Sequence, residues 1–192
     1  MEMDYGTPKK LPDGRYYLKV TSSATGGRVM VQLNKVKLLT KFDDSEEVTL
    51  QLSSAGVDKI TAIDADILQA AKTNCVSWFG KQMGDETLDA AYSNSIQVTK
   101  MNVSKASVKG SVVTKIYAAD KQPLESSALD VGAECDIMLE FSGIWFMKKT
   151  FGSIWRIAQV RLTAPPKKIY PDEYLFQDDE VVVEEEVDDD YI

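Results

Sequence analysis

Residues 141–171 read Phe-Ser-Gly-Ile-Trp-Phe-Met-Lys-Lys-Thr-Phe-Gly-Ser-Ile-Trp-Arg-Ile-Ala-Gln-Val-Arg-Leu-Thr-Ala-Pro-Pro-Lys-Lys-Ile-Tyr-Pro. This stretch holds six basic residues and no acidic one, and it includes Trp145, Phe146, Phe151 and Trp155, four of the large aromatic residues of the chain. Its pattern predicts a β-hairpin that turns near residues 149–152. The charge then reverses, because residues 172–192 contain eleven Asp and Glu and neither Lys nor Arg. The sequence is therefore organised around a basic, aromatic hairpin followed by an acidic tail.

The charge balance of the whole chain hides this division. The formal net charge is −8, but residues 1–171 carry 22 basic and 19 acidic residues, a net charge of +3. An acidic whole chain would disfavour a nucleic-acid partner, whereas the charge counted by region permits one. The length of 192 residues suits one packed domain with an extension.

Several classes of function are disfavoured by what the sequence lacks. Without histidine, neither a Ser-His-Asp nor a Cys-His nucleophile can form, and too few soft ligands remain for zinc. Cys75 and Cys135 lie far apart in apolar settings, so we expect two buried thiols. No phosphate-binding loop is present. We therefore predict a protein that is not an enzyme and that has no catalytic residue, cofactor or metal site. An intracellular protein without signal peptide or membrane span is also expected.

Alternating apolar residues predict strands over residues 15–20, 28–39, 48–52, 96–101, 111–118 and 133–141, before the hairpin. A phase flip at Asn34-Lys35 predicts a β-bulge. Between the third and fourth strands, apolar residues recur at helical spacing from Ile60 to Trp78, and residues 85–92 suit a short second helix. A Ser/Lys/Gly loop is expected to join the fourth and fifth strands.

The order of elements predicts an all-β domain with one inserted helix. An OB-fold-like small barrel of about five strands, with the helix between the third and fourth, fits this order, and a β-sandwich is the alternative. Three regions follow: a loose N-terminal arm (1–14), the barrel domain (15–171) and a disordered acidic tail (172–192).

Three predicted strands place cations and aromatic rings on one face. These sets are Arg15, Tyr17 and Lys19; Lys115 and Tyr117; and Trp155 with Arg161. A site for single-stranded nucleic acid needs cations for phosphates and aromatic planes for unstacked bases. The alternative is an ordinary amphipathic β-face with snorkelling side chains. The candidate nucleic-acid-binding residues are Arg15, Tyr17, Lys19, Arg28, Lys35, Lys37, Lys115, Tyr117, Trp145, Lys148, Lys149, Phe151, Trp155, Arg156 and Arg161.

The acidic tail ends in Asp188, Asp189, Asp190, Tyr191 and Ile192, which we predict to be its partner-binding residues. A tail that only solubilises, which is the alternative, does not need an apolar end. Such an end suits a basic-rimmed apolar pocket on a partner. Twenty-one flexible residues span roughly 25 Å, so the tail can also reach a basic groove on its own domain.

The run Phe-Ser-Gly-Ile-Trp-Phe, then Phe151-Gly152 and residues 155–162, resembles the single-stranded DNA-binding proteins of large nucleocytoplasmic DNA viruses. That group is similar to the replication single-stranded DNA-binding protein of short-tailed coliphages. Those proteins are OB-folds whose acidic tail ends in an aromatic residue, whereas this chain closes on Tyr191-Ile192.

The resemblance implies a protein that coats single-stranded DNA during viral DNA replication, recombination and repair. Its tail would recruit the viral DNA polymerase or other replication proteins and compete with DNA. The implied location is the host nucleus or a cytoplasmic viral replication site, and a homodimer is left open. The alternative function is an acidic adaptor that binds histones or replication proteins without binding DNA directly.

Overall fold

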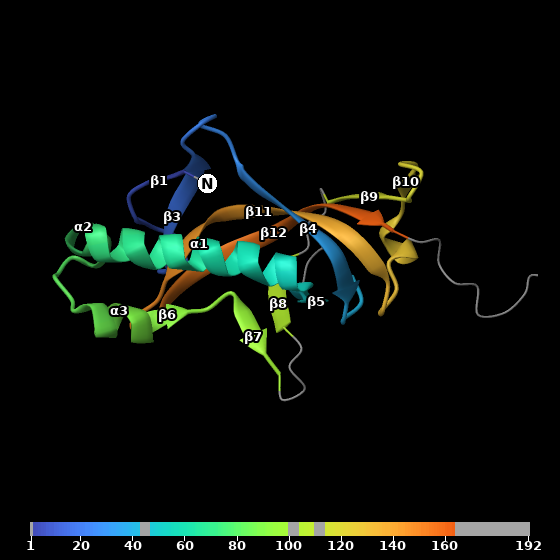
Figure 1. Ribbon diagram of the computed structural model, residues 1–192. Helices are drawn as coiled ribbons and strands as arrows, with labels where there is room; N and C mark the ends of the chain where they lie inside the picture. Colours follow the sequence, from blue (N-terminus) through green and yellow to red (C-terminus); the bar gives the residue numbers. More distant parts are fainter. Residues whose placement is uncertain (1, 43–46, 100–103, 110–113, 164–192) are drawn as a thin grey trace, which may run out of the picture.

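The computed structural model describes residues 2–42, 47–99, 104–109 and 114–163, as Figure 1 shows. The acidic tail predicted for residues 172–192 lies outside the described residues, so its predicted disorder and its partner-binding residues are not tested.

The described strands are β1 (Met3–Tyr5), β2 (Lys9–Lys10), β3 (Tyr16–Ser22), β4 (Val29–Leu38), β5 (Glu47–Gln51), β6 (Tyr92–Ser93), β7 (Ile96–Val98), β8 (Ser104–Lys109), β9 (Lys115–Tyr117), β10 (Pro123–Leu124), β11 (Glu134–Phe146) and β12 (Phe151–Leu162). The helices are α1 (Ser54–Thr73), α2 (Cys75–Phe79), α3 (Asp85–Ala91) and the 3-10 helix η1 (Ser126–Ala128).

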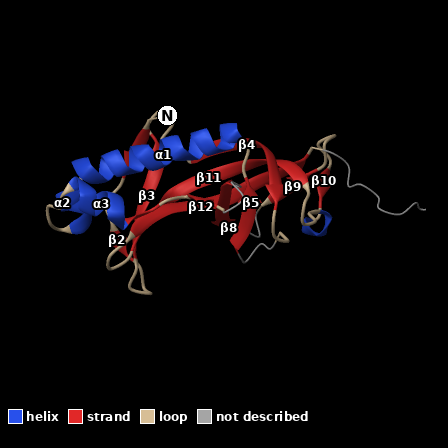
Figure 2. Cartoon of the chain, turned by 60° about the horizontal axis from the view of Figure 1, so that its bottom comes forward, coloured by secondary structure: helices blue, strands red, loops and turns tan. Residues whose placement is uncertain are grey.

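Five strands close a barrel in the order β4-β5-β8-β12-β11, because β11 pairs with both β12 and β4. The β8–β12 contact is parallel and the other four are antiparallel. A five-stranded barrel of this kind is OB-fold-like. The predicted fold class, all-β with an inserted helix, is therefore confirmed. Helix α1 runs along one side of the sheet, and α2 and α3 lie together at one end (Figures 1 and 2).

The helix lies one barrel strand earlier than predicted. Strand β3 pairs with residues 143–146 of β11, and β4 pairs with residues 134–141 of the same strand. Both run antiparallel to β11, so together they act as one interrupted barrel strand. Helix α1 follows β5, which is the third strand predicted along the chain. In the closed barrel, however, β5 is only the second strand, because β3 and β4 count as one.

The predicted bulge at Asn34-Lys35 is confirmed. Val36 opposes Cys135, whereas Leu33 opposes Ile137, and Lys35 has a positive φ of 54°. The extra residue lets Val29, Val31 and Leu33 face the interior together with Val36 and Leu38. Strand β4 can therefore bend around the barrel without losing its buried face.

The helix predicted up to Trp78 is interrupted. Asn74 ends α1, and both its backbone N–H and its side-chain Nδ2 donate to the carbonyl oxygen of Ala70. Helix α2 then ends at Gly80, whose φ of 73° suits a left-handed cap. The short second helix predicted at residues 85–92 is confirmed as α3.

Two predicted loops contain strands. The loop expected between residues 101 and 111 contains β8, which pairs with β5 and buries Ala106 and Val108. Because β8 consists mainly of small and basic residues, its alternation of buried and exposed positions was not visible in the sequence. The N-terminal arm contributes β1 and β2, which both pair with β3, so the prediction that it is loose is wrong for these residues. Sheet pairing can order a segment whose composition is polar.

Both thiols are buried and free, as predicted. Burial, reinforced by the nearby Asp136 carboxylate, raises the pKa of Cys135 to about 12. None of the helices in the described part of the chain is long and apolar enough to cross a membrane.

Gly143 is the point of closest approach between β3 and β11. A Cβ there would meet the carbonyl oxygen of Leu18 and would lie 2.7 Å from Cε2 of Tyr17. The β11–β12 register also shifts beside it, between Phe141 and Gly143. Gly143 therefore lies both at a β-bulge and at a close approach of two backbones, the two settings that favour glycine within a strand.

We predict that Gly143→Ala lowers the free energy of unfolding by about 1–3 kcal/mol, because the strands must separate to admit a methyl group. Urea denaturation measures this change. Gly84→Ala is the matched control, since a Cβ at Gly84 has no neighbour within 4 Å. Equal stability of the two variants would contradict the close approach.

Candidate nucleic-acid interface

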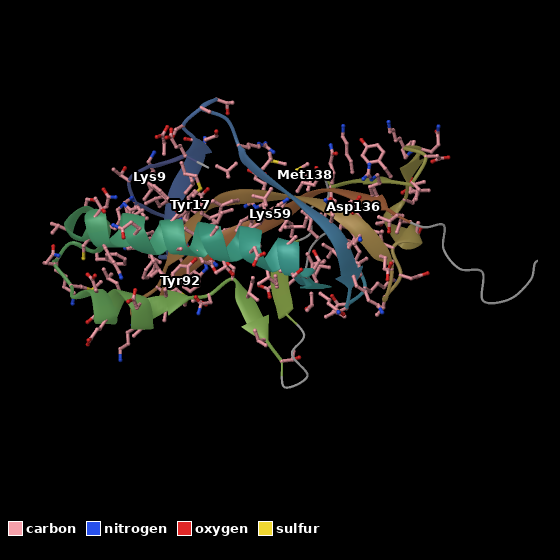
Figure 3. The ribbon with its side chains drawn as sticks, in the orientation of Figure 1. Lys9, Tyr17, Lys59, Tyr92, Asp136 and Met138 are labelled. Atoms are coloured by element: carbon pink, nitrogen blue, oxygen red, sulfur yellow. The ribbon has the colours of Figure 1, made fainter. Side chains whose placement is uncertain are left out.

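The outer surface of β2, β3, β4, β9, β11 and β12 brings together seven of the fifteen residues predicted to bind nucleic acid. We call this surface the outer face. Its members, taken from side chains that point away from the barrel interior, are Lys9, Tyr17, Lys19, Met30, Gln32, Lys115, Tyr117, Asp136, Met138, Glu140, Trp145, Arg156, Gln159 and Arg161. Figure 3 shows Tyr17, Met138 and Asp136 following one another along the length of β11.

One row of the outer face is aromatic and basic. Lys9 pairs with Tyr17, Tyr17 with Trp145, and Trp145 with Gly152, so the row crosses four strands. Gly152 leaves room for the indole, because a Cβ there would lie 2.9 Å from Cζ2 of Trp145. Two half-buried rings thus lie side by side, with Lys9 next to them.

The Tyr17 ring is held in place by its hydroxyl group, which donates to the carbonyl oxygen of Ser142 at 2.6 Å. Burial raises the pKa of Tyr17, opposed by the Arg156 cation and reinforced by the Glu140 carboxylate. Tyr17 therefore stays neutral at physiological pH. Its hydroxyl group lies close enough to Arg156 and Glu140, in the neighbouring row, to be affected by their charges.

That next row contains Met30, Glu140 and Arg156 as cross-strand neighbours. Glu140 also accepts a hydrogen bond from Arg28 Nη1 at 3.3 Å. The Arg28 side chain is 74% exposed, so its ion pair contributes little to stability and leaves its charge open to a ligand.

Farther along β11, Asp136 lies opposite Arg161, which in turn pairs with Tyr117 of β9. Oδ2 of Asp136 accepts from Arg161 Nη2 at 2.5 Å, and Oδ1 accepts from the backbone N–H of Lys35 at 3.2 Å. Tyr117 and Arg161 therefore lie on one face as cross-strand neighbours, through the parallel pairing of β9 with β12.

The structure corrects the expected orientation of Trp155. Its side chain is 5% exposed and packs against Phe141, with 5.1 Å between ring centroids. Ile157 opposes Leu139 whereas Gln159 opposes Met138, so Ala158 is an extra residue. This bulge reverses the parity of β12, and therefore Trp155 faces inward although Arg161 faces outward.

Trp155 also anchors a buried polar cluster. Its Nε1 donates to the hydroxyl oxygens of Ser153 at 2.8 Å and Ser95 at 3.1 Å. Asp64 of α1 accepts from Ser95 Oγ at 2.5 Å and from the Tyr92 hydroxyl at 2.7 Å. This cluster joins the inserted helix to β12, and burial together with Asp64 raises the pKa of Tyr92. The alternation of polar and apolar residues did not reveal this cluster, because Asp64, Ser95 and Ser153 each resemble ordinary surface residues when read alone.

Phe151 is also a core residue rather than a surface one. It is 1% exposed and stacks on Phe146, with 6.0 Å between the ring centroids. The hairpin turn spans residues 147–150, two residues earlier than predicted, and is closed by the Met147 N–H bonding to the Thr150 carbonyl. Phe151 therefore begins β12 instead of standing at the turn.

The remaining candidates lie outside the outer face. Lys148 and Lys149 rim a hollow of about 1020 Å³ at the hairpin tip, whose floor includes Phe79 and Phe146. Arg15 is exposed and bonds to Asp13, with Nε to Oδ2 at 2.7 Å. Lys35 and Lys37 line a separate hollow beside Arg161, described below.

Sequence patterns missed Lys9, Met30 and Gln32 as members of the outer face. Lys9 was assigned to a loose arm, and only its pairing with Tyr17 places it there. In the described part of the chain, no group of three or more Cys, Asp or Glu could hold a metal ion.

The barrel and its outer face define an OB-fold-like β-barrel protein with a cationic, aromatic surface. The chain belongs to the family of unknown function DUF5871, whose pattern matches residues 34–178. No curated protein matches the sequence.

Among solved structures, the chain is similar to the single-stranded DNA-binding protein from bacteriophage Enc34 in complex with ssDNA. The TM-score is 0.50 at 11% identity, covering 83% of this chain and 94% of that chain. A C-terminal truncation of the Enc34 protein gives a TM-score of 0.50 at 12% identity, with the same coverage. At such low identity the likeness concerns the fold.

We predict that Trp155→Ala lowers the free energy of unfolding by about 3–5 kcal/mol, because it empties a core site. It also leaves Ser95 and Ser153 without their indole donor. Trp145→Ala is the matched control and should cost clearly less, since its ring is half-buried on the outer face. Chemical denaturation of both variants tests this, and a larger loss for Trp145→Ala would contradict the assignment of the two rings.

Proposed function

We propose that this chain binds single-stranded DNA through its outer face, without strong sequence preference. The observation that carries the proposal is the row formed by Lys9, Tyr17 and Trp145. Two adjacent rings beside a cation suit unstacked bases and their phosphates, and stacking contributes about 1–3 kcal/mol per base. The fold likeness to a single-stranded DNA-binding protein supports the same function.

The bound DNA strand would run along β11. Bases would stack on Tyr17 and Trp145, while Lys9, Lys19 and Arg156 would contact phosphates. From Trp145 to Asp136 the strand β11 advances nine residues, which is about 30 Å at 3.3 Å per residue. A path of this length accommodates several nucleotides, in keeping with the ~4–16 nucleotides bound per OB-fold.

Two acidic side chains on the same surface limit its affinity. Glu140 pairs with Arg28, so this arginine must exchange a carboxylate for a phosphate when DNA binds, and Asp136 offsets the positive charge of Arg161. Such a face favours binding that is moderate in strength and strongly dependent on salt.

In the cell, the proposed role is to coat and protect single strands during viral DNA replication, recombination and repair. The resemblance of residues 140–161 to proteins of large nucleocytoplasmic DNA viruses supports this role, and it favours a site of viral replication in the host. Binding alone accounts for the role, without catalysis or a cofactor.

The acidic tail has two proposed roles. Its eleven negative charges would compete with DNA for the cations of the outer face, and its apolar end, Tyr191-Ile192, would dock on the viral polymerase or another replication protein. The charge opposition between the tail and residues 141–171 supports the first role, and the apolar terminus supports the second.

We expect oligo(dT) to bind with an affinity that falls as salt rises. The slope of log K against log salt should be about −0.7 per phosphate contacted. Trp145→Ala should weaken binding by about 1–3 kcal/mol through lost stacking, with the fold retained. Fluorescence anisotropy at several salt concentrations measures both. Tighter binding to duplex than to single strand, or an affinity independent of salt, would refute the proposed function and favour an adaptor without DNA binding.

Truncation after Pro171 should tighten oligonucleotide binding at low salt, because an intramolecular competitor is removed. The gain should shrink near 1 M salt, where the Debye length is about 3 Å. Removal of Tyr191 and Ile192 alone is the matched control, since it keeps all eleven acidic residues. That deletion should retain the competition and lose the polymerase in a pull-down. Equal affinity of full-length and truncated chains at low salt would exclude competition by the tail.

A further inference from the structure

A small hollow of about 350 Å³ opens on the outer face where β4, β11, β12 and β9 come together. Its volume lies at the lower end of the range for ligand sites, which is about 300–1,000 Å³. Its lining includes Gln32, Tyr117, Lys121, Met138, Gln159 and Arg161. These residues combine an aromatic side, an apolar floor and polar edges, which is the composition of a site for a flat heterocycle.

The apolar part of the hollow is set by strand register. Met138 is half-buried and lies between Gln32 of β4 and Gln159 of β12. One step along the barrel, Tyr117 lies beside Arg161. A planar group that enters the hollow therefore meets a polarizable thioether below it and an aromatic ring at one side.

The polar edge of the hollow is preorganised. Arg161 is held by Asp136, which is itself fixed by the backbone N–H of Lys35 in the β4 bulge. The ion pair uses one nitrogen of the guanidinium, whose rigid fork carries five N–H donors. Gln32 is also oriented, since its Nε2 donates to Asn34 Oδ1 at 2.8 Å.

Cations flank the hollow on two sides. Lys121 lines it directly, in a turn closed by its backbone N–H, which donates to the carbonyl oxygen of Ala118 at 3.0 Å. A second hollow shares Gln32, Asp136 and Arg161 with the first, and Lys35 and Lys37 in its lining outnumber the added carboxylate of Glu134. A chain of phosphates on either side of an inserted base would therefore meet positive charge.

We propose that this hollow is a base-reading subsite, which seats one unstacked base of the bound strand and favours guanine. The subsite rests on the proposed function and adds one selective position to an otherwise sequence-tolerant surface. Guanine presents N7 and O6 as two adjacent acceptors, which the fork of an arginine fits. Adenine places a donor at the second position, and pyrimidines lack N7, so both match Arg161 less well.

The test compares oligo(dT) with the same oligonucleotide carrying one guest residue, namely dG, dA, dC or an abasic site. The full-length chain should bind the dG guest about fivefold or more tightly than oligo(dT), from the discrimination of one bidentate contact. Fluorescence anisotropy at a single salt concentration gives the ratio of the two affinities. The abasic guest should bind more weakly than any base.

Arg161→Lys keeps the positive charge but loses the planar fork, so the ratio of dG-guest to oligo(dT) affinity should fall to about one. Arg156→Lys is the matched control, because Arg156 lies on the same strand outside the hollow, and it should keep the ratio. Asp136→Asn, which releases Arg161, should lower the ratio as well. Thermal melting of each variant shows whether it is folded.

The outcomes separate this subsite from the function on which it rests. Binding of oligo(dT) without preference for the dG guest overturns the subsite and leaves the proposed function standing. An unchanged ratio in folded Arg161→Lys or Asp136→Asn also overturns it. Failure of the wild-type chain to bind any of the oligonucleotides refutes the proposed function, and the subsite with it.

Discussion

Strand β11 is bonded on one side to β3 and β4 in succession and on the other side to β12. This shared ladder closes the barrel, and it also sets which side chains become neighbours on the outer face. The positions of the side chains on the outer face, among them Tyr17, Trp145, Glu140 and Arg156, follow from the pairing register along this one strand. The function proposed for the surface therefore depends on backbone pairing more than on any single side-chain contact.

Three irregularities in this ladder decide which residues face a ligand. The bulges at Asn34-Lys35, Ser142 and Ala158 each reverse the alternation of a strand. The first anchors Asp136 through the Lys35 N–H, the second places Gly143 beneath the Tyr17 ring, and the third turns Trp155 into the core. A regular ladder of the same sequence would present a different surface.

Much of the fold could be predicted from the sequence, because buried faces repeat at a period of two in strands and near 3.6 in helices. Strand β4, the alternation of β11 and helix α3 were correctly expected, and the bulge at Lys35 was visible as a phase flip. The orientation of Trp155 was not predictable, since the extra residue Ala158 is defined only by pairing with β11. Strand β8 escaped notice because only Ala106 and Val108 carry its buried face. The contribution of Lys9 was not predictable either, because it depends on the pairing of β2 with β3, which the polar composition of the N-terminal arm does not indicate.

The barrel has an uneven seam. Strands β8 and β12 meet at a single register pair, Arg156 with Lys109, in the described part of the chain, whereas β11 and β12 pair over most of their lengths. Local opening of a protein follows its least bonded contacts. Opening of the barrel would therefore begin at the β8–β12 contact, while the hydrogen bonds of Ser95 to Asp64 and Trp155 keep α1 attached to β12. The surface formed by β3, β11 and β12 would keep its shape during such an opening, because β11 and β12 pair along most of their lengths.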